Sequence, residues 1–465
     1  MNGETMIKLV ESWKNIDGNI NKTSEIIKWV NELNSEVKVI INKNSLEESS
    51  FWFYDKDMGI IRNKNNSFFS ITGYQKKINN KIIKQQPIII QNEIGYLGII
   101  CKEIDGVINF LMQAKIEPGN INKIQISPTI QATKSNFTQK HGGNKPKYLE
   151  YFVNSYNYET VVDQLQSEQS SRFYKKRNRN IIIKVDEEIE ISQNYKWMTL
   201  GQIKELMKIN NLVNMDTRTV LSCIPFSIYK FTEDELIKIE KNFIEKDLFK
   251  SIFLGDRNLD IVSIYQYINN YKMFDESKEE LCSLEELKNW NFKNNEILCN
   301  EKYDFKVIFC DISIEGREVR NWTQPLFEAN GIATLGLIMC NDNGVKKFLI
   351  NCKEEIGCFD KIELAPTVQI EYTQHSIKYD YITKLFFDMY NQKKYTRYDV
   401  ILSEEGGRFY HEQNHNIIIE IDKSKVNKIP NGYFWVDYKT LNVMTQINNC
   451  LNIQLRNLLS LLEVG

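Results

Sequence analysis

The chain repeats itself over a long distance, and this duplication constrains its fold more than any other feature. The segment that begins at Gln86 aligns without a gap to the segment that begins at Gln324, at an offset of 238 residues. Identical aligned pairs include Gly98/Gly336, Lys115/Lys353 and Pro128/Pro366. A period of this length indicates a duplicated domain rather than a short solenoid repeat. The 465 residues therefore divide into two domains, which we place at residues 1–225 and 226–465.

Composition excludes several classes of function. Charged residues make up 26% of the chain and the net charge is −2, so no general field favours nucleic acid. No apolar stretch reaches membrane-spanning length, and the first residues do not resemble a signal peptide. The nine cysteines form no CxxC pair. Several of them (Cys101, Cys340, Cys352) lie in apolar runs, which favours reduced, buried thiols in a cytoplasmic protein.

The same order of elements is expected in each copy. The turn pairs Asp105-Gly106 and Asn343-Gly344 lie between apolar runs and predict type I′ hairpins. The other expected elements are helices at 24–33 and 262–271, strands near Trp52 and Trp290, a short strand at 123–126, a polar helix at 159–170, strands at 180–185 and 416–421, and a closing helix at 200–223 with Thr199 as its N-cap (Asp437 in copy two). This mixture predicts an α+β (mixed α/β) fold in which each repeat packs a mixed sheet with helices.

No common catalytic signature is present. The chain lacks GxGxxG, GxxxxGK[ST], GxSxG and HExxH, and its four histidines share no metal-ligand spacing between the copies. Instead, amide, hydroxyl and charged side chains are dense between residues 113 and 143, at the ends of predicted strands. Such groups suit a ribose, diphosphate or hexose; the alternative is a hydrogen-bond network that caps strand ends.

These segments resemble the nucleoside-diphosphate-hexose 2,3-dehydratases of deoxysugar biosynthesis. The resemblance rests on QAKIEPGN (113–120), SPTIQATKSNFT (127–138), HGG (141–143) followed by YLEYF (148–152), LAPTVQ (364–369) and SEEGGRFYH (403–411). It covers almost the whole chain and implies tandem Nudix-like domains, a homodimer, and a nucleotide sugar bound in each half, with one pocket catalytic and the other auxiliary. Neither copy has the glutamate-rich Nudix box, so pyrophosphate hydrolysis is disfavoured.

The implied reaction uses no cofactor and no metal. The 4-ketone of an NDP-4-keto-6-deoxyhexose, with dTDP as the family expectation, acidifies the proton on C3. A base removes this proton, the C2 hydroxyl leaves, and the enone tautomerises to a 2-deoxy-3,4-diketo sugar. The site must supply a base, an acid and a donor to the enolate.

Residue chemistry favours the second copy for catalysis. The catalytic candidates are Glu371, Tyr372, His375, Glu405 and Tyr410. Several first-copy counterparts do not titrate, such as Thr133 for Glu371 and Phe137 for His375. A pocket that only binds ligand tolerates the loss of ionisable side chains. The opposite choice, with Lys115, Glu117 and His141 active, stays open.

The predicted substrate-binding residues come from both copies. They are Trp52, Lys115, Glu117, Thr129, Gln131, Ser135, Asn136, Phe137, Thr138, Gln139 and Arg172 in the first, and Trp290, Lys353, Thr367, Gln369, Thr373, Ser376, Gly407, Arg408 and Phe409 in the second. The paired tryptophans can stack on a base or anchor the core. The paired arginines can bind a diphosphate or form structural salt bridges.

Two other functions remain as alternatives to a dehydratase. One is a nucleotide-sugar-binding protein without catalysis, and the other is a divergent Nudix hydrolase. The sequence predicts a nucleotide sugar and a second copy of the chain as partners, with neither nucleic acid nor membrane.

Overall fold

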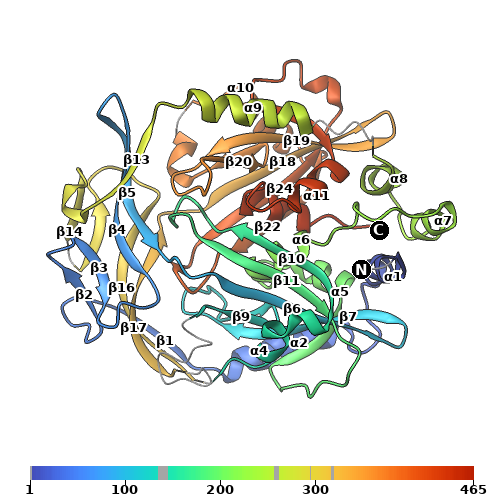
Figure 1. Cartoon of the computed structure of the whole chain (residues 1–465), viewed down its shortest axis with the longest axis horizontal. Coiled ribbons are helices and arrows are strands. Elements are labelled where there is room, and N and C mark those ends of the chain that lie inside the picture. The colour runs from blue at the N-terminus through green and yellow to red at the C-terminus, as the bar shows by residue number, and fades with distance from the viewer. Residues whose placement is uncertain are drawn as a thin grey trace.

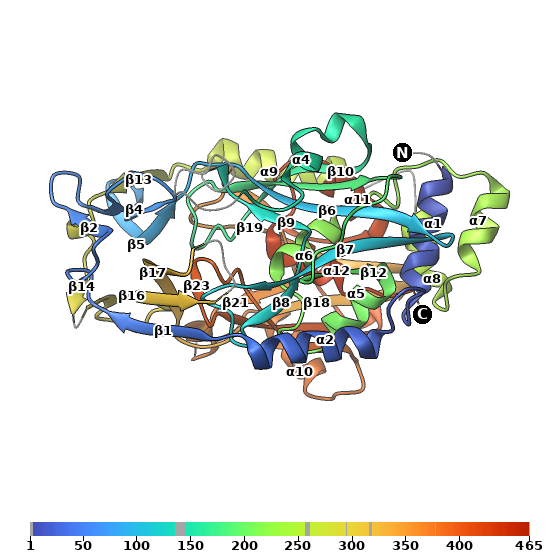
Figure 2. The ribbon, with the colours of Figure 1, turned by 90° about the horizontal axis from the view of Figure 1, so that it is seen from below.

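The computed structural model describes residues 3–134, 145–255, 261–293, 295–315, 319–376 and 378–464. Each repeat contributes one large sheet and most of one small sheet, and the small sheets lie together at one end of the molecule (Figures 1 and 2). Helices cover the large sheets at the other end, where the two chain ends also lie (Figure 1). The α+β class expected from the sequence is confirmed. None of the described helices combines the length and apolar character needed to cross a membrane.

The two large sheets share one topology. In the first repeat the order is β10 (Glu159–Ser167), β11 (Arg177–Lys184), β6 (Gly95–Ile104), β7 (Val107–Ile116) and β12 (Tyr195–Thr199), with β8 (Ile124–Ser127) on β7 and β9 (Ile130–Ala132) on β6. In the second repeat the equivalents are β22 (Thr396–Ser403), β24 (Gln413–Glu420), β18 (Ala333–Asp342), β19 (Val345–Glu354) and β25 (Tyr433–Asp437), with β20 (Ile362–Ala365) on β19 and β21 (Val368–Ile370) on β18.

The predicted hairpins are confirmed at both copies. Asp105 and Gly106 have φ of 50° and 78°, and Asn343 and Gly344 have φ of 53° and 80°. Both central residues therefore adopt the left-handed conformation that a type I′ turn requires. The first strand of each hairpin also pairs in parallel with a neighbour on its outer edge, β11 or β24.

The small sheets exchange a strand between the repeats. The first contains β2 (Trp52–Asp55), β3 (Ile60–Asn63), β4 (Ser70–Ile78) and β5 (Lys81–Ile90), but its edge strand is β13 (Lys278–Cys282) from the second repeat. The second contains β14 (Trp290–Lys293), β15 (Glu296–Cys299), β16 (Phe305–Ile314), β17 (Asn321–Ala329) and β23 (Phe409–Tyr410), but its edge strand is β1 (Val39–Asn44) from the first. Because β1 and β13 are equivalent in the alignment, each repeat completes the sheet of the other.

The helices follow the pattern of the repeat. They are α1 (Gly3–Lys14), α2 (Thr23–Glu36), α4 (Leu149–Val153), α5 (Leu200–Met207), α6 (Met215–Ser222), α7 (Glu233–Glu240), α8 (Lys246–Phe249), α9 (Ile261–Phe274), α10 (Tyr381–Tyr390), α11 (Tyr438–Thr445) and α12 (Ile453–Ser460). The expected N-caps are confirmed, since Thr199 accepts from the backbone N–H of Gln202 and Asp437 from that of Thr440.

Two predicted elements were wrong. Residues 159–167 form a strand instead of a polar helix, because the β-branched residues 160–162 pair with β11 and bury Val161 and Val162. The closing helix at 200–223 is two helices, because Asn211 takes a left-handed φ of 59° and Asn214 caps a new helix by accepting from Thr217 N–H. Because the helix is interrupted, α6 begins beside the first-repeat sheet, where Asn214 N–H donates to the carbonyl of Ile126.

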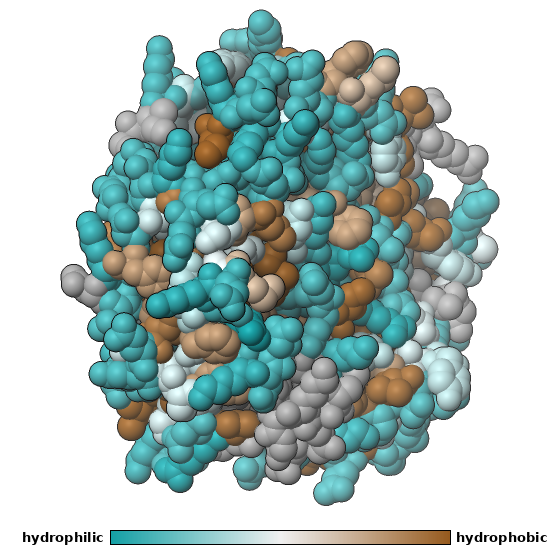
Figure 3. Space-filling model, turned by 60° about the vertical axis from the view of Figure 1, so that its left-hand side comes forward, coloured by the Kyte–Doolittle hydropathy of each residue, from teal (hydrophilic) through white to brown (hydrophobic). Residues whose placement is uncertain are grey.

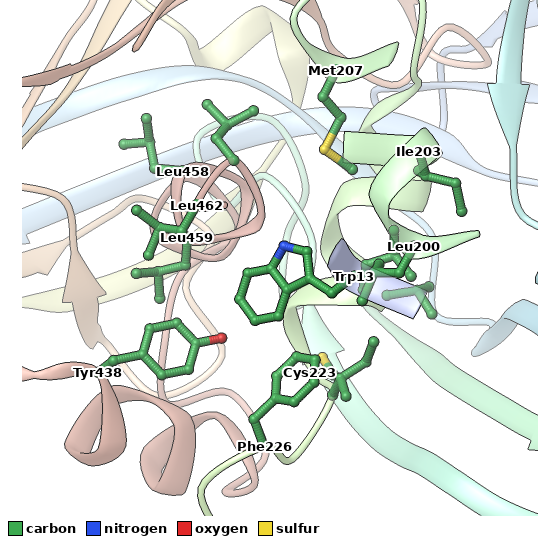
Figure 4. Close-up of a cluster of buried hydrophobic side chains, with 14 of the residues drawn as sticks. Trp13, Leu200, Ile203, Met207, Cys223, Phe226, Tyr438, Leu458, Leu459 and Leu462 are labelled. Atoms are coloured by element: carbon green, nitrogen blue, oxygen red, sulfur yellow. The ribbon is translucent and has the colours of Figure 1, made fainter. Parts of the chain in front are cut away.

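A continuous core joins the repeats. Trp13 of α1 packs with Leu200 and Ile203 of α5, with Phe226, and with Leu458 and Leu462 from the end of the second repeat (Figure 4). All of these side chains are buried. The core therefore extends across the boundary between the two repeats. The nine cysteines are free thiols, and Cys101, Cys340 and Cys352 are buried as expected.

Candidate functional site

A cavity of about 790 Å³ lies between the repeats. Two loops meet beside it, because Gly119 N–H donates to the carbonyl of Gly406 at 2.7 Å and His411 N–H donates to that of Gly119 at 2.9 Å. A Cβ on Gly119 would lie 1.6 Å from the carbonyl oxygen of Phe409, so only glycine allows this approach. The contact brings the first-repeat loop that carries Glu117 next to the second-repeat loop that carries Glu405 and Arg408.

One end of the cavity holds a hydrogen-bonded set of polar side chains from the first repeat. Gln131 on β9 donates from Nε2 to Glu117 Oε1 at 2.9 Å, and Lys115 Nζ lies 3.6 Å from the same oxygen. Lys115 also donates to the carbonyl of Gln131 at 3.2 Å, and Asn214 donates to Gln131 Oε1 at 3.3 Å. These bonds fix the Glu117 carboxylate and the Lys115 ammonium at the strand ends that face the cavity.

Two further carboxylates line this end of the cavity. Glu405 accepts from Gly407 N–H at 2.8 Å through Oε1, while its buried Oε2 has no hydrogen-bond partner among the described residues. Burial, and next the charge of Glu117, raise the pKa of Glu405 to about 7. Burial, and next the charge of Glu168, hold the pKa of Asp216 on α6 well above its usual range. Burial thus favours the protonated form of both carboxyl groups.

An arginine lines the same cavity beside these groups. Arg408 stacks its guanidinium over the ring of Phe69 at 4.6 Å and donates to the carbonyl of Gly407 at 3.0 Å. No carboxylate of the described chain lies within ion-pair distance of it, and its Nε is buried without a partner. A guanidinium with free donors at a cavity wall suits a phosphate or diphosphate.

The outer part of the cavity has one aromatic and one polar wall. Phe51, Trp52, Phe68 and Phe69 form the aromatic wall, and Phe68 has a left-handed φ of 63°, which is strained for a bulky residue. The polar wall runs across β1, β16 and β17, where Asn42 faces Asp311 and Asp311 faces Thr323 in the strand register. The exchanged strand β1 therefore supplies part of the cavity. Figure 3 shows the end of the molecule with the small sheets, whose surface is mostly hydrophilic.

Most of the predicted binding residues fall into three groups. Lys115, Glu117, Gln131, Trp52, Gly407 and Arg408 line the cavity. Thr129 and Thr367 are buried and bond the strand backbones at Ile100 and Ile338, Phe409 is buried against Phe173, and Trp290 packs on Tyr303 and Phe305. Residues Ser135, Asn136, Phe137, Thr138, Gln139 and His141 lie outside the described residues, as does the side chain of Ser376.

The predicted catalytic residues do not form one constellation. Glu405 lines the cavity. Glu371 lies 3.5 Å from the guanidinium of Arg172, and His375 hydrogen-bonds to Thr334 and Tyr379. Tyr372 is exposed near Lys302, and Thr373 bonds Asp304. Tyr410 stacks on His411 at 4.0 Å between their ring centroids.

The equivalent region of the second repeat keeps the polar set of the first. Lys353 donates to the carbonyl of Gln369 at 2.7 Å, Gln369 donates to Glu355 at 2.8 Å, and Asn452 donates to Gln369 at 2.9 Å. The titratable carboxylates differ, because Gln454 and Gln169 stand at the positions equivalent to Asp216 and Glu405. Sequence reasoning missed Asp216, although the aligned pair Asp216/Gln454 is visible in the repeat.

The described part of the chain has no group of three His, Cys, Asp or Glu side chains that could hold a metal ion. The cavity itself is lined by the titratable groups Lys115, Glu117, Asp216 and Glu405. They suit proton transfer to and from a bound polar molecule with an anionic part.

Comparison with known proteins gives one consistent result. The family model for NDP-hexose 2,3-dehydratase matches residues 23–224 and again residues 262–462. A dTDP-4-dehydro-6-deoxy-alpha-D-glucopyranose 2,3-dehydratase of Saccharopolyspora spinosa is 36% identical over 445 residues, which covers 95% of this chain and 91% of the relative. The enzyme of the same name from Amycolatopsis orientalis is 31% identical over 97% of this chain and 92% of its own length. The resemblance seen in the sequence motifs is thus confirmed, and the chain belongs to the NDP-hexose 2,3-dehydratase family.

Proposed function

We propose that the chain is a carbon–oxygen lyase that removes water from dTDP-4-keto-6-deoxy-D-glucose, and that it does so in the cavity between the repeats. One observation supports the assignment of catalysis to this cavity. Both repeats keep the Lys–Glu–Gln–Asn set, but Asp216 and Glu405 line the cavity at positions where the equivalent region of the second repeat has two amides. An amide keeps shape and hydrogen bonds but cannot transfer a proton. The second repeat also has carboxylates, Glu371 and Glu412, but both lie within ion-pair distance of Arg172. Glu405 and Asp216 have no such partner among the described residues, so we place catalysis at these two groups.

Each proton transfer has a matching group in the cavity. Glu405, with a pKa of about 7 and a free Oε2, takes the C3 proton that the 4-ketone makes acidic. Asp216, whose pKa burial and the charge of Glu168 raise well above its usual range, gives a proton to the C2 hydroxyl, which leaves as water. The ammonium of Lys115 stabilises the negative charge that develops on the C4 oxygen. The resulting 3-hydroxy-enone loses the proton of its hydroxyl group, takes up a proton at C2 and becomes the 2-deoxy-3,4-diketo sugar.

The rest of the cavity fits the nucleotide. Arg408 binds the diphosphate, because it is the cavity arginine without a carboxylate partner among the described residues. The aromatic wall at Phe51 and Phe68 accepts the face of the base, and the polar row at Asn42 and Thr323 faces its edge. The hexose then lies at the carboxylate end.

Incubation with the 4-keto nucleotide sugar tests this function directly. A dehydratase yields a product lighter by one water, which a ketoreductase or aminotransferase traps, and in D₂O the product carries deuterium at C2. A protein that only binds returns the substrate unchanged. A Nudix hydrolase releases a nucleoside monophosphate, and that result would refute the proposal.

Two properties of the whole protein belong to the same proposal. The active form is a homodimer in the cytoplasm; the free thiols support a reducing compartment. Helix α9 carries three strongly exposed apolar side chains, Val262, Met273 and Phe274, which support association. Light scattering at micromolar concentration that shows a monomer with full activity would contradict the dimer.

A further inference from the structure

The loop that follows strand β3 is built around one buried side chain. Asn63, the last residue of β3, is fully buried and stands opposite Trp52 in the strand register. Its Oδ1 accepts from the N–H of Asn65 at 3.1 Å, and from the N–H and the hydroxyl group of Ser67 at 3.1 Å and 3.2 Å. Its Nδ2 donates to the carbonyl of Ser67. A single carboxamide therefore fixes the course of residues 64–67.

This loop brings Phe68 to the cavity in a conformation that a phenylalanine disfavours. Phe68 has a φ of 63°, in the left-handed region where the Cβ atom crowds the backbone. Its ring lines the cavity beside Phe51, and the two ring centroids lie 6.4 Å apart in a T-shaped contact. The strained backbone thus belongs to a residue whose ring forms part of the cavity wall.

The equivalent loop of the second repeat shows that the fold does not require this strain. The strand register places Cys299 of β15 where β3 has Asn63, because each stands opposite an aligned tryptophan. At the same distance further along the chain, Asp304 stands where the first repeat has Phe68. Asp304 is not among the described residues with a positive φ, although aspartate adopts this conformation more readily than phenylalanine. Strain that folding does not need is typical of ligand-binding sites.

We propose that Asn63 is a positioning residue for the nucleotide, and that it holds the loop so that the ring of Phe68 forms a platform for the base. Without the four hydrogen bonds of the carboxamide, residues 64–67 relax, Phe68 returns to an ordinary φ, and its ring leaves the cavity wall. The strain at Phe68 is therefore retained for binding and not for folding. This inference rests on the proposed function, which places the base at the aromatic wall.

Calorimetric titrations with dTDP and with inorganic pyrophosphate separate the contact to the base from the contact to the diphosphate. Phe68→Ala should weaken dTDP binding by about 5-fold to 150-fold, the range that stacking of a base on an aromatic side chain contributes. Asn63→Cys, which copies the residue of the second repeat, should weaken it by up to the same factor. Both variants should bind pyrophosphate, which lacks a base, as the wild type does. The double variant should lose no more dTDP affinity than Phe68→Ala, because Asn63 acts through Phe68.

Asn109→Cys is the matched control for the loss of a buried carboxamide. Asn109 on β7 is 1% exposed, and its Nδ2 donates to Asn19 and to the carbonyl of Val107, but it does not line the cavity. This variant should keep the dTDP affinity of the wild type. In turnover, Asn63→Cys should raise KM for the nucleotide sugar and leave kcat unchanged, because the base contact is remote from the reacting carbons. Circular dichroism shows whether each variant is folded.

Melting temperatures provide a second measurement, which needs no ligand. Phe68→Gly and Phe68→Ala both remove the ring, but only glycine adopts a positive φ without strain. Phe68→Gly should therefore melt at a higher temperature than Phe68→Ala. Addition of Asn63→Cys to both should remove this advantage of glycine, because the loop then relaxes whichever residue follows it.

Several results would overturn the inference while the proposed function stands. They are unchanged dTDP affinity in folded Phe68→Ala or Asn63→Cys, additive losses in the double variant, an equal loss in Asn109→Cys, and a Phe68→Gly variant that melts no higher than Phe68→Ala. A loss of pyrophosphate affinity equal to that of dTDP would also overturn it. A wild-type chain that binds no dTDP would refute the proposed function and this inference with it.

Discussion

Replacement of Glu405 by glutamine tests the proposed base with the smallest change in shape. The amide is the side chain that the second repeat carries at the equivalent position, Gln169. Gly407 N–H donates to Oε1 at 2.8 Å, and an amide oxygen accepts the same bond. The variant therefore removes the proton acceptor and leaves the loop in place.

The expected loss follows from the role. General acid–base groups contribute about 10²–10⁴-fold to rate, which corresponds to about 2.7–5.5 kcal/mol of transition-state stabilisation. We expect kcat to fall by that factor while dTDP affinity stays the same. Because the base must be ionised, wild-type kcat should rise with pH through about 7, where burial and Glu117 place the pKa of Glu405. The rise of kcat with pH should be absent in Glu405→Gln.

The variant should not be less stable than the wild type. The folded-state pKa of Glu405 lies above its unfolded value, so the folded protein binds the extra proton and loses stability as pH rises from about 4.5 towards about 7. Glutamine removes this dependence. Chemical denaturation at pH 5 and pH 8 should therefore show a smaller difference for the variant.

Glu363→Gln is the matched control. Glu363 on β20 is also buried with a pKa raised to about 7 by burial, but it accepts from Ser167 and does not line the cavity. Turnover should survive this change. A loss below tenfold in Glu405→Gln, or an equal loss in Glu363→Gln, would refute the role of Glu405. The second-repeat candidates Glu371 and Tyr410 would then be tested in the same assay.

Three more predictions follow from the site. Arg408→Gln should weaken dTDP binding by about tenfold to 150-fold, since hydrogen bonds to charged groups are worth about 1.5–3 kcal/mol; Arg408→Lys should restore part of the loss, and calorimetry that shows unchanged affinity would contradict the diphosphate contact. Chelation with EDTA should leave turnover intact, because the proposed chemistry is proton transfer by side chains; activity that returns only on addition of a divalent ion would contradict this. Gly119→Ala should lower the melting temperature and kcat together, because its Cβ would lie 1.6 Å from the Phe409 carbonyl oxygen and separate the two loops at the cavity. A variant with the melting temperature and turnover of the wild type would contradict this prediction.

Local sequence determined much of the fold. The Asp-Gly and Asn-Gly pairs specify their hairpins, because few other residues accept positive φ at both turn positions. The N-caps at Thr199 and Asp437 follow from short polar side chains before a helix. Residues 159–167 were wrongly predicted as a helix, because a strand with one exposed face can be as polar as a surface helix. Only the pairing of this segment with β11 decides between strand and helix.

The repeat itself, the family and the set of polar side chains were available from the sequence alone, because identity at a fixed offset needs no coordinates. The tertiary structure decided which of those side chains meet. Backbone hydrogen bonds are the same at every sheet edge, so no pattern in β1 or β13 shows that each strand joins the sheet of the other repeat. The same exchange of partners sets Glu405 and Arg408 of one repeat against Glu117 of the other, and it gives Arg172 two carboxylates while Arg408 has none within reach. The charge of Arg172 is compensated by residues 199 and 240 positions further along the chain, and only folding fixes the distances between them.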